Sequence, residues 1–349
     1  MDDAYNVASI VEGGRRIITG PLFDPEDGVC LVAPPGNGQG YWAGAPGIFW
    51  DQDAGEFFLA YRLREPRGPE DRGRGYEVRV AESRDGVTFK DVFVISKQEL
   101  NSPSLERAAL FKDAAGEYRL LFSYVDPSDR RWRIDAIGAR HPSEFRLDRR
   151  EPAFTAPDAG AEGVKDPWIM NVNGTYYLYM SYAPRPDRAI DEPTMHATAD
   201  AFSTGYTRSL TGLATSRDGR RFEWAGISLG VGTTWDSYES RISSVVYVPP
   251  FFLAFYDGIA SLERNYEEQS GLGASLTLRR FTRITEEGPV LKSPHGSGSL
   301  RYVDVAVRDR EWLFYYEYCR PDGSHELRMS RVDPRSLRLA ELFTGGAGQ

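Results

Sequence analysis

The sequence has little cysteine, no excess of positive charge and no long apolar run. Its 349 residues include two cysteines, Cys30 and Cys319, and no close-spaced pair, which excludes a disulfide scaffold and a cysteine-based zinc site. The formal net charge of −9 argues against a nucleic-acid partner and against binding to an anionic membrane. The longest apolar run, 245–256, is broken by two prolines, so no segment is suited to span a bilayer.

Helical periodicity is also almost absent, and the acidic N-terminus lacks the apolar stretch of a signal peptide. We therefore expect a cytoplasmic protein. What the sequence does contain is turns and aromatic residues: 35 glycines, 22 prolines and 13% aromatics. Tyrosine and phenylalanine favour strands, so this composition predicts an all-β protein.

The chain repeats a short aromatic strand that ends in tyrosine. The five closing tyrosines are spaced by 63, 58, 74 and 60 residues, and a second short apolar run precedes each strand by about 15 residues. Turn residues such as Asn173-Gly174 separate the two runs, which is a hairpin signal. The closing tyrosines are Tyr61, Tyr124, Tyr182, Tyr256 and Tyr316.

A period near 60 residues with several short strands in each unit is typical of a β-propeller. We predict an all-β, five-bladed β-propeller in a single domain, with a β-sandwich carrying long loops as the alternative. The blades are expected at roughly residues 30–95, 96–150, 151–230, 231–285 and 286–335, with the N-terminal segment 1–29 available to complete the ring.

Charged residues stand at the start of most blades. In a propeller the first strand of each blade lines the central channel, so polar residues just before these strands converge near the axis. Four of the five blade starts carry a carboxylate and four carry a cation. The candidate active-site carboxylates are Glu106, Asp166 and Glu239, whereas Asp304 lies deeper in its strand, where a structural role is expected. Surface turns with solvated ion pairs are the alternative.

These features resemble the five-bladed propeller glycosidases, the superfamily of glycoside hydrolase families 32, 43, 62, 117 and 130. The resemblance covers about residues 30–332. Its most specific part is Lys165-Asp166-Pro167-Trp168-Ile169 with the hairpin at 174–179, which looks like a blade start of those families. Residues 235–238 with Pro249-Pro250 and 255–258 look like the fourth blade of family 130, the mannoside phosphorylases and their hydrolytic relatives.

The resemblance implies carboxyl groups at the axis, one that protonates the leaving oxygen and one that activates water or assists phosphate delivery. On this basis Glu239 is the candidate acid, Glu106 its partner and Asp166 a further active-site carboxylate. The chain departs from families 32 and 43 at the first blade, where Gly44-Ala45-Pro46 replaces a catalytic Asp. This departure leaves a non-catalytic protein open.

Cations and aromatic residues near the blade starts are candidates for binding a substrate. Arginine holds phosphate or carboxylate with two parallel hydrogen bonds, although each arginine can equally pair with a neighbouring carboxylate. Aromatic faces can stack on sugar rings or pack between blades. His295 lies in a loop similar to one of family 43. The candidates are Trp42, Arg62, Arg107, Lys165, Trp168, Tyr238, Arg241, His295, Arg301 and Tyr302.

The resulting hypothesis is a glycoside hydrolase that uses axial carboxylates as general acid and base. Two alternatives are open, a mannoside-type phosphorylase and a non-catalytic carbohydrate-binding propeller, the latter supported by Ala45. We expect no cofactor: propellers of this kind sometimes hold one ion on the axis, but no ligand cluster is legible in the sequence. The expected partner is a carbohydrate, with no nucleic acid and no membrane.

Overall fold

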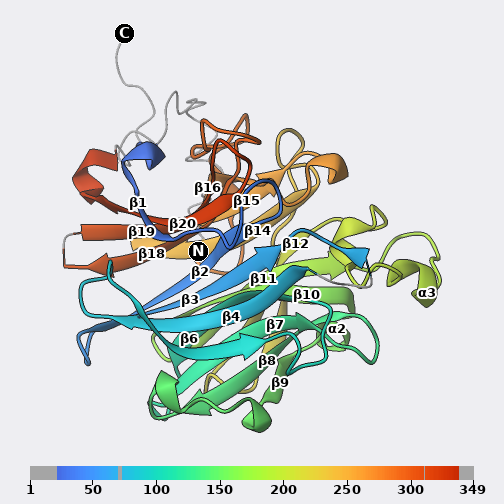
Figure 1. Cartoon of the computed structure of the whole chain (residues 1–349), viewed down its shortest axis with the longest axis horizontal. Helices are drawn as coiled ribbons and strands as arrows, with labels where there is room; N and C mark the ends of the chain where they lie inside the picture. Colours follow the sequence, from blue (N-terminus) through green and yellow to red (C-terminus); the bar gives the residue numbers. More distant parts are fainter. Residues whose placement is uncertain (1–21, 70–72, 310, 338–349) are drawn as a thin grey trace, which may run out of the picture.

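The computed structural model describes residues 22–69, 73–309 and 311–337, and these residues are mostly in antiparallel strands. The described α-helices, α2 (Ala156–Ala159) and α3 (Glu192–Met195), are single turns, and the remaining helical segments are short 3₁₀ turns. No described helix has the length and apolar character needed to cross a membrane. Figure 1 shows the strands and places α3 at one end of the molecule.

Hydrogen bonding groups consecutive strands into antiparallel sets of four. Three sets are separate sheets. They are β6 (Leu105–Lys112), β7 (Tyr118–Val125), β8 (Trp132–Ala139) and β9 (Glu151–Phe154); β10 (Ala161–Val172), β11 (Thr175–Pro184), β12 (Leu210–Ser216) and β13 (Glu223–Leu229); and β14 (Glu239–Val248), β15 (Phe251–Ile259), β16 (Gln269–Ser275) and β17 (Thr282–Arg283).

The remaining eight strands form one sheet with two halves. One half is β2 (Trp42–Asp51), β3 (Glu56–Glu65), β4 (Arg74–Ser83) and β5 (Lys90–Ser96), and the other is β18 (Leu300–Arg308), β19 (Glu311–Cys319), β20 (His325–Val332) and β1 (Val29–Val32). A parallel bridge between Trp42 and His325 joins the halves. β1 pairs with β20, so a strand from the start of the chain completes the set at its end. Residues 1–21 of the N-terminal segment lie outside the described residues.

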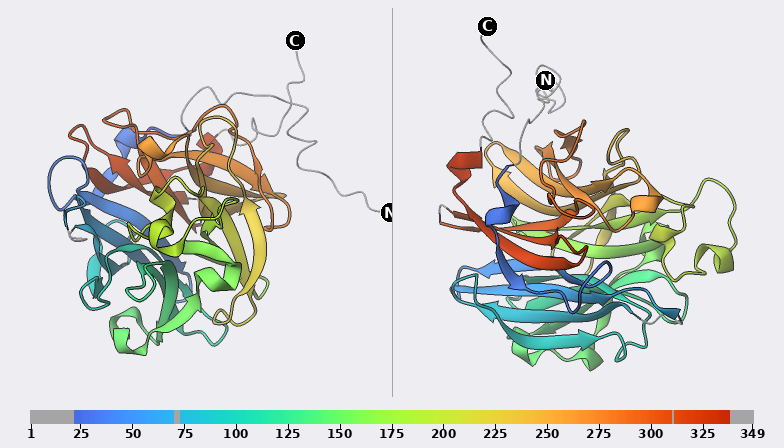
Figure 2. Two further views of the ribbon diagram at one scale, coloured as in Figure 1. Left: turned by 90° about the vertical axis from the view of Figure 1, so that its right-hand side faces the viewer. Right: turned by 45° about the horizontal axis from the view of Figure 1, so that its top comes forward.

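The first strands of the five sets form a closed ring. β2 contacts β6, and the contacts continue through β10, β14 and β18 back to β2. Figure 2 (left) shows the sets fanned around a common centre in the order of the sequence colours. The prediction of an all-β propeller is therefore confirmed, and the closing tyrosines lie in the second strand of each set.

The hydrophobic core lies between neighbouring sets. Between the first two, Phe58 and Val80 pack with Leu110, Leu120 and Phe122, all at most 4% exposed. Burying each such side chain contributes about 1.5–3 kcal/mol to folding. These interfaces hold each set against the next and so fix where the first strands meet.

Each first strand carries a β-bulge near the ring centre. Ala45, Asp166 and Tyr302 hold equivalent bulge positions in β2, β10 and β18, with left-handed φ angles of 50°, 55° and 55°. A bulge bends the strand and redirects a side chain. The charged blade starts therefore lie within the first strands, not before them as the sequence predicts, because the bulge interrupts the apolar alternation that marks a strand.

Arg107, on the bulge of β6, crosses the ring centre and is fully buried. Its Nε donates to the carbonyl oxygen of Pro46 at 2.8 Å, and its Nη1 donates to the carbonyl oxygen of Ser243 at 2.8 Å. Its Nη2 lies 3.1 Å from Oδ2 of Asp304. One guanidinium thus ties β6 to β2, β14 and β18.

We predict that Arg107→Met lowers the free energy of unfolding by roughly 3–5 kcal/mol, because it leaves the buried Asp304 carboxylate without its cation. Adding Asp304→Asn should recover part of this loss by removing the charge. Chemical denaturation measures both effects. Arg84→Met, on an exposed arginine, is the matched control and should change stability by less than about 0.5 kcal/mol. A cost for Arg107→Met no larger than that of the control would contradict the role of Arg107.

Candidate active site

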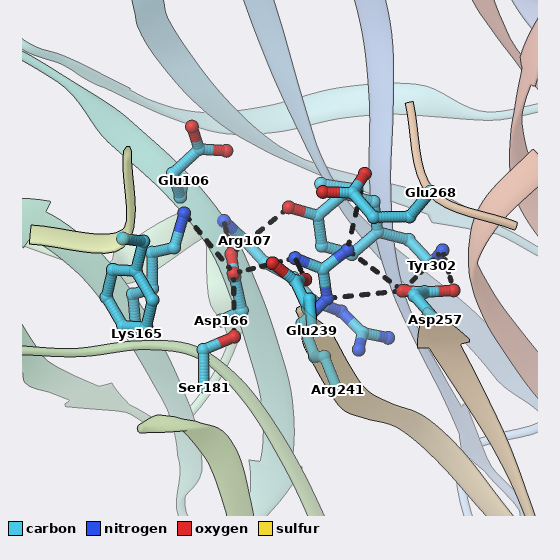
Figure 3. A network of polar contacts seen from close by, with 12 residues as sticks. Glu106, Arg107, Lys165, Asp166, Ser181, Glu239, Arg241, Asp257, Glu268 and Tyr302 are labelled. Carbon is cyan, nitrogen blue, oxygen red and sulfur yellow. Dashed lines mark hydrogen bonds and ion pairs between the residues drawn. The ribbon is translucent and has the colours of Figure 1, made fainter. Parts of the chain in front are cut away.

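The centre of the ring is a buried network of acids and arginines, and Arg241 of β14 is its hub. Arg241 Nη1 lies 3.2 Å from Oδ2 of Asp166 and 3.0 Å from Oε1 of Glu239, and Nη2 lies 3.0 Å from Oδ2 of Asp257. Figure 3 shows the three carboxyl groups turned toward this guanidinium. The contact to Glu239 lacks hydrogen-bond geometry, which leaves that oxygen without a hydrogen-bond partner among the described residues.

Asp166 is an ionised carboxylate held by donors from several strands. Ser181 donates to its Oδ2 at 3.2 Å, and the hydroxyl of Tyr302 donates to its Oδ1 at 3.4 Å. The side chain is fully buried, which by itself would raise its pKa. Lys165 and Arg241 outweigh burial and hold the pKa of Asp166 below its ordinary value. Asp166 is therefore suited to act as a base or an anion, not as an acid.

Glu239, the first residue of β14, has the opposite character. Burial, reinforced by the neighbouring carboxylates Glu268 and Asp166, raises the pKa of Glu239 to about 8, despite the attraction of Arg241. Glu239 thus carries a proton at neutral pH. Glu239 and Asp166 contact the same guanidinium group, but the pKa of one is raised and that of the other is lowered. This difference is the pattern of a general acid and its ionised partner.

Tyr302 fills the middle of the ring beneath the arginines. The guanidinium carbon of Arg241 lies 3.9 Å from the centroid of its ring, and those of Arg301, Arg107 and Arg62 lie 5.2, 5.8 and 6.0 Å away. Burial raises the pKa of Tyr302 well above its ordinary value, so the phenol stays neutral. An aromatic face of this kind attracts cations and spaces the four guanidinium groups around one point.

Two further glutamates complete the network on the side of β2. Glu106 forms an ion pair with Arg62, and Glu317 of β19 binds both Arg62, at 2.9 Å, and Arg301, at 2.7 Å. The backbone N–H of Ala45 donates to Oε2 of Glu317 at 3.0 Å. A Cβ on Gly44 would meet that same oxygen at 2.2 Å, which explains the glycine. Glu317 thus brings a carboxylate to the bulge where Ala45 provides none.

The segment 196–206, between α3 and β12, lies across this end of the ring. Arg74 donates to the carbonyl oxygen of Ala199 at 3.1 Å, and the indole N–H of Trp132 donates to Asp200 at 3.0 Å. Figure 2 (left) shows the segment passing in front of the centre. It is held by side chains from several sets and acts as a cover.

Phe202 is the part of this cover that contacts Lys165 and Tyr238. Its ring lies 4.9 Å from Nζ of Lys165, and its carbonyl oxygen accepts a hydrogen bond from the hydroxyl of Tyr238 at 2.8 Å. Under the cover, Glu106, Asp166 and Glu239 are exposed by 2%, 0% and 3%. Access of a substrate to these groups therefore requires the cover to move.

The structure brings most sequence-predicted site residues into one network. Those joined in it are Glu106, Asp166, Glu239, Arg62, Arg107, Lys165, Arg241, Arg301 and Tyr302.

The other candidates lie at the edge of the network or outside it. Trp42 lies at the edge, with its ring 4.8 Å from Arg301. Trp168 donates to Asp304 at 2.9 Å and packs between sets, and Tyr238 holds the cover. His295 does not reach the network: its Nε2 lies 3.2 Å from Glu26 Oε2 at the partly exposed rim.

Sequence reasoning missed Asp257, Glu268 and Glu317, which come from the second strands and from the segment before β16. A signal for two of them exists in the repeat. Asp257 and Glu317 directly follow closing tyrosines, as Arg62 does. A charged residue at that position of the repeat marks a side chain that reaches the ring centre.

We predict that Glu239→Gln removes a pH dependence of stability. The pKa of Glu239 is about 8 in the folded protein and about 4.5 when unfolded, so the wild type loses stability as pH rises through that interval. The slope is roughly 1.4 kcal/mol per pH unit. Urea unfolding from pH 5 to pH 9 should show the variant gaining on the wild type up to about pH 8. Glu223→Gln, on an exposed glutamate, should show no such gain. A difference between Glu239→Gln and the wild type that is constant across this range would refute the assignment.

Several solved structures with the same fold carry names of glycoside hydrolases or phosphorylases. A β-1,2-mannobiose phosphorylase from Listeria innocua, in complex with β-1,2-mannobiose, matches with a TM-score of 0.57 and 16% identity, over 94% of this chain and 98% of that one. A glycosyl hydrolase from Bacteroides ovatus matches with a TM-score of 0.55 and 15% identity, over 92% and 94%. The β-xylosidase RS223 matches with a TM-score of 0.60 and 14% identity, over 89% and 97%. No family model and no curated protein matches the sequence. The chain shares the fold of glycoside hydrolases and of a mannoside phosphorylase, as the resemblance in sequence implied.

Proposed function

We propose that this protein hydrolyses glycosidic bonds, with Glu239 as the general acid and Asp166 as the ionised partner. The observation that carries the proposal is the contact of both buried carboxyl groups with Arg241 Nη1, in surroundings that lower the pKa of Asp166 and raise the pKa of Glu239. A general acid must hold its proton at the working pH, and its partner must be ionised. Both conditions hold near pH 7. The fold shared with glycoside hydrolases supports the same reaction class.

The spacing of the two carboxyl groups suggests which reaction course they suit. Both interacting oxygens lie about 3 Å from one nitrogen, so they are at most about 6 Å apart. Carboxyl groups of retaining glycosidases stand about 5–5.5 Å apart, and those of inverting enzymes roughly 6.5–9.5 Å apart, with room for a water. The closed arrangement is nearer the retaining spacing. Arg241 lies between the two groups, so a substrate must displace it as well as the cover.

Phosphorolysis is the second candidate, and the arginines around Tyr302 favour it. Guanidinium groups are the usual binders of phosphate, and four of them face this ring. Each of the four also has a carboxylate within ion-pair distance, so phosphate would compete with acids that are already in place. This competition makes hydrolysis the better-supported reaction.

We predict release of sugar from a panel of aryl glycosides and β-mannosides in the absence of phosphate. Asp166→Asn and Glu239→Gln should each lower kcat/KM by roughly 10²–10⁴-fold. The wild-type rate should fall above about pH 8, where Glu239 loses its proton, and this alkaline limb should be missing from the residual activity of Glu239→Gln. Product release is followed by chromatography at each pH.

The controls separate the rival functions. If turnover requires inorganic phosphate, the reaction is phosphorolysis and not hydrolysis. Saturable binding of oligosaccharides without turnover across the panel would show a binding protein, consistent with Ala45 at the first bulge. Full activity of folded Asp166→Asn, with folding checked by circular dichroism, would show that the carboxylates are assigned wrongly.

A further inference from the structure

A second group of reactive side chains lies beside the axial network and takes no part in the reaction proposed above. Glu267 precedes β16, Cys319 ends β19 and His325 begins β20. Each offers one ligand atom, and the three atoms lie within 4.8 Å of one another. The side chains are 8%, 1% and 0% exposed. A carboxylate, a thiol and an imidazole, which can each bind a metal ion, thus lie close together in the interior.

His325 is oriented as a ligand. Its Nδ1 lies 2.8 Å from Oε1 of Glu317, and Trp42 stacks on its ring with the centroids 4.7 Å apart. Its Nε2 is fully buried, points toward the cluster and has no hydrogen-bond partner among the described residues. A carboxylate on one ring nitrogen, which sets the orientation of the other, is the usual support of a metal-binding histidine.

The distances are close to those around a tetrahedral ion. His325 Nε2 lies 3.2 Å from Oε2 of Glu267, and ligand atoms of a tetrahedral zinc with nitrogen and oxygen ligands stand roughly 3.3 Å apart. Ser297 Oγ lies 3.6 Å from Sγ of Cys319 and contacts Glu267. Ser297 thus lies beside both Cys319 and Glu267, and the three ligand atoms lie within 4.8 Å of one another.

A cavity reaches the cluster from the surface. Its volume is about 320 Å³, and its lining includes Glu267, Gly296 and Ser297. The cavity therefore borders the cluster at Glu267, which is the one proposed ligand among its lining residues. Three protein ligands with one open position are found in catalytic zinc sites, whereas structural sites are closed by four.

We propose that Glu267, Cys319 and His325 bind a zinc ion. Thiolate and imidazole are ligands for zinc and not for calcium or magnesium, which take oxygen ligands. The sequence has no close-spaced cysteine pair, and for this reason no cysteine-based zinc site was expected. That argument does not apply to a mixed site that contains a single cysteine. The proposal likewise replaces the expectation of no cofactor.

The ion would be joined to the axial network through Glu317. This glutamate contacts His325 on one side and Arg62 and Arg301 on the other. The proposal does not depend on hydrolysis or phosphorolysis at the ring centre.

Titration of the full-length, chelator-treated protein with Zn²⁺ and with Co²⁺ tests the proposal. We expect one ion per chain by calorimetry. The Co²⁺ form should show a thiolate charge-transfer band in the near ultraviolet. Cys319→Ser should abolish that band, and His325→Gln should weaken binding at least about 100-fold. Cys30→Ser changes the exposed cysteine of β1 and is the matched control, which should keep both the band and the affinity.

Circular dichroism and the unfolding midpoint establish that each variant is folded. If His325→Gln does not fold, Glu267→Gln at the partly exposed side of the cluster gives the same comparison. If the wild-type protein shows no saturable binding of Zn²⁺ at millimolar concentration, the proposal is wrong. An unchanged Co²⁺ band in Cys319→Ser, or loss of the band in Cys30→Ser, would overturn it as well.

Discussion

The rest of the structure depends on the neutralisation of charge at the centre of the ring. Removing a carboxylate or a guanidinium from water costs several kcal/mol, and only well-placed opposite charges offset that cost. Here Asp166, Asp257 and Glu239 gather on one arginine, while Glu317 is shared between two others. Asp166 of β10 pairs with Arg241 of β14, and Glu317 of β19 pairs with Arg62 of β3, so these ion pairs join different sets of strands. The apolar interfaces between sets favour the ring, and the charges select its register.

The same buried charges also determine which carboxyl groups of the site are ionised. Arg241 pairs with Asp166 and so keeps it ionised, while burial beside Glu268 keeps Glu239 protonated. A substrate that enters must supply polar groups in place of those that Arg241 and the cover now provide, or the buried acids are left uncompensated. Stability and reactivity are therefore carried by the same residues. Sugars, with many hydroxyl groups in fixed directions, are well suited to such an exchange.

Much of the fold was predictable because the repeat of closing tyrosines is a regular pattern along the chain. Asp166 was predictable because its Lys-Asp-Pro surroundings are distinctive, and Glu106 and Glu239 because they occupy similar places in other units. Glu317 and Asp257 were missed because the sequence analysis searched the starts of the first strands, whereas these two acids directly follow the closing tyrosines of the second strands. The proposed zinc ligands were missed because Glu267 precedes β16 in one sheet, whereas Cys319 and His325 lie on β19 and β20 of another, so no spacing in the sequence links them. His295 shows the reverse error: it lies in the loop that the resemblance indicated, but turns outward to Glu26.

The pairing of β1 with β20 has a consequence for synthesis in the cell. A ribosome makes β1 long before its partner β20, which is the last strand among the described residues. Until then the arginines and acids of the earlier strands lack their charged partners on β18 and β19. The growing chain therefore contains charged groups that are not yet neutralised. Synthesis of β18, β19 and β20 is thus the step that closes the ring, so the nascent polypeptide is fully held together only after these strands have been made.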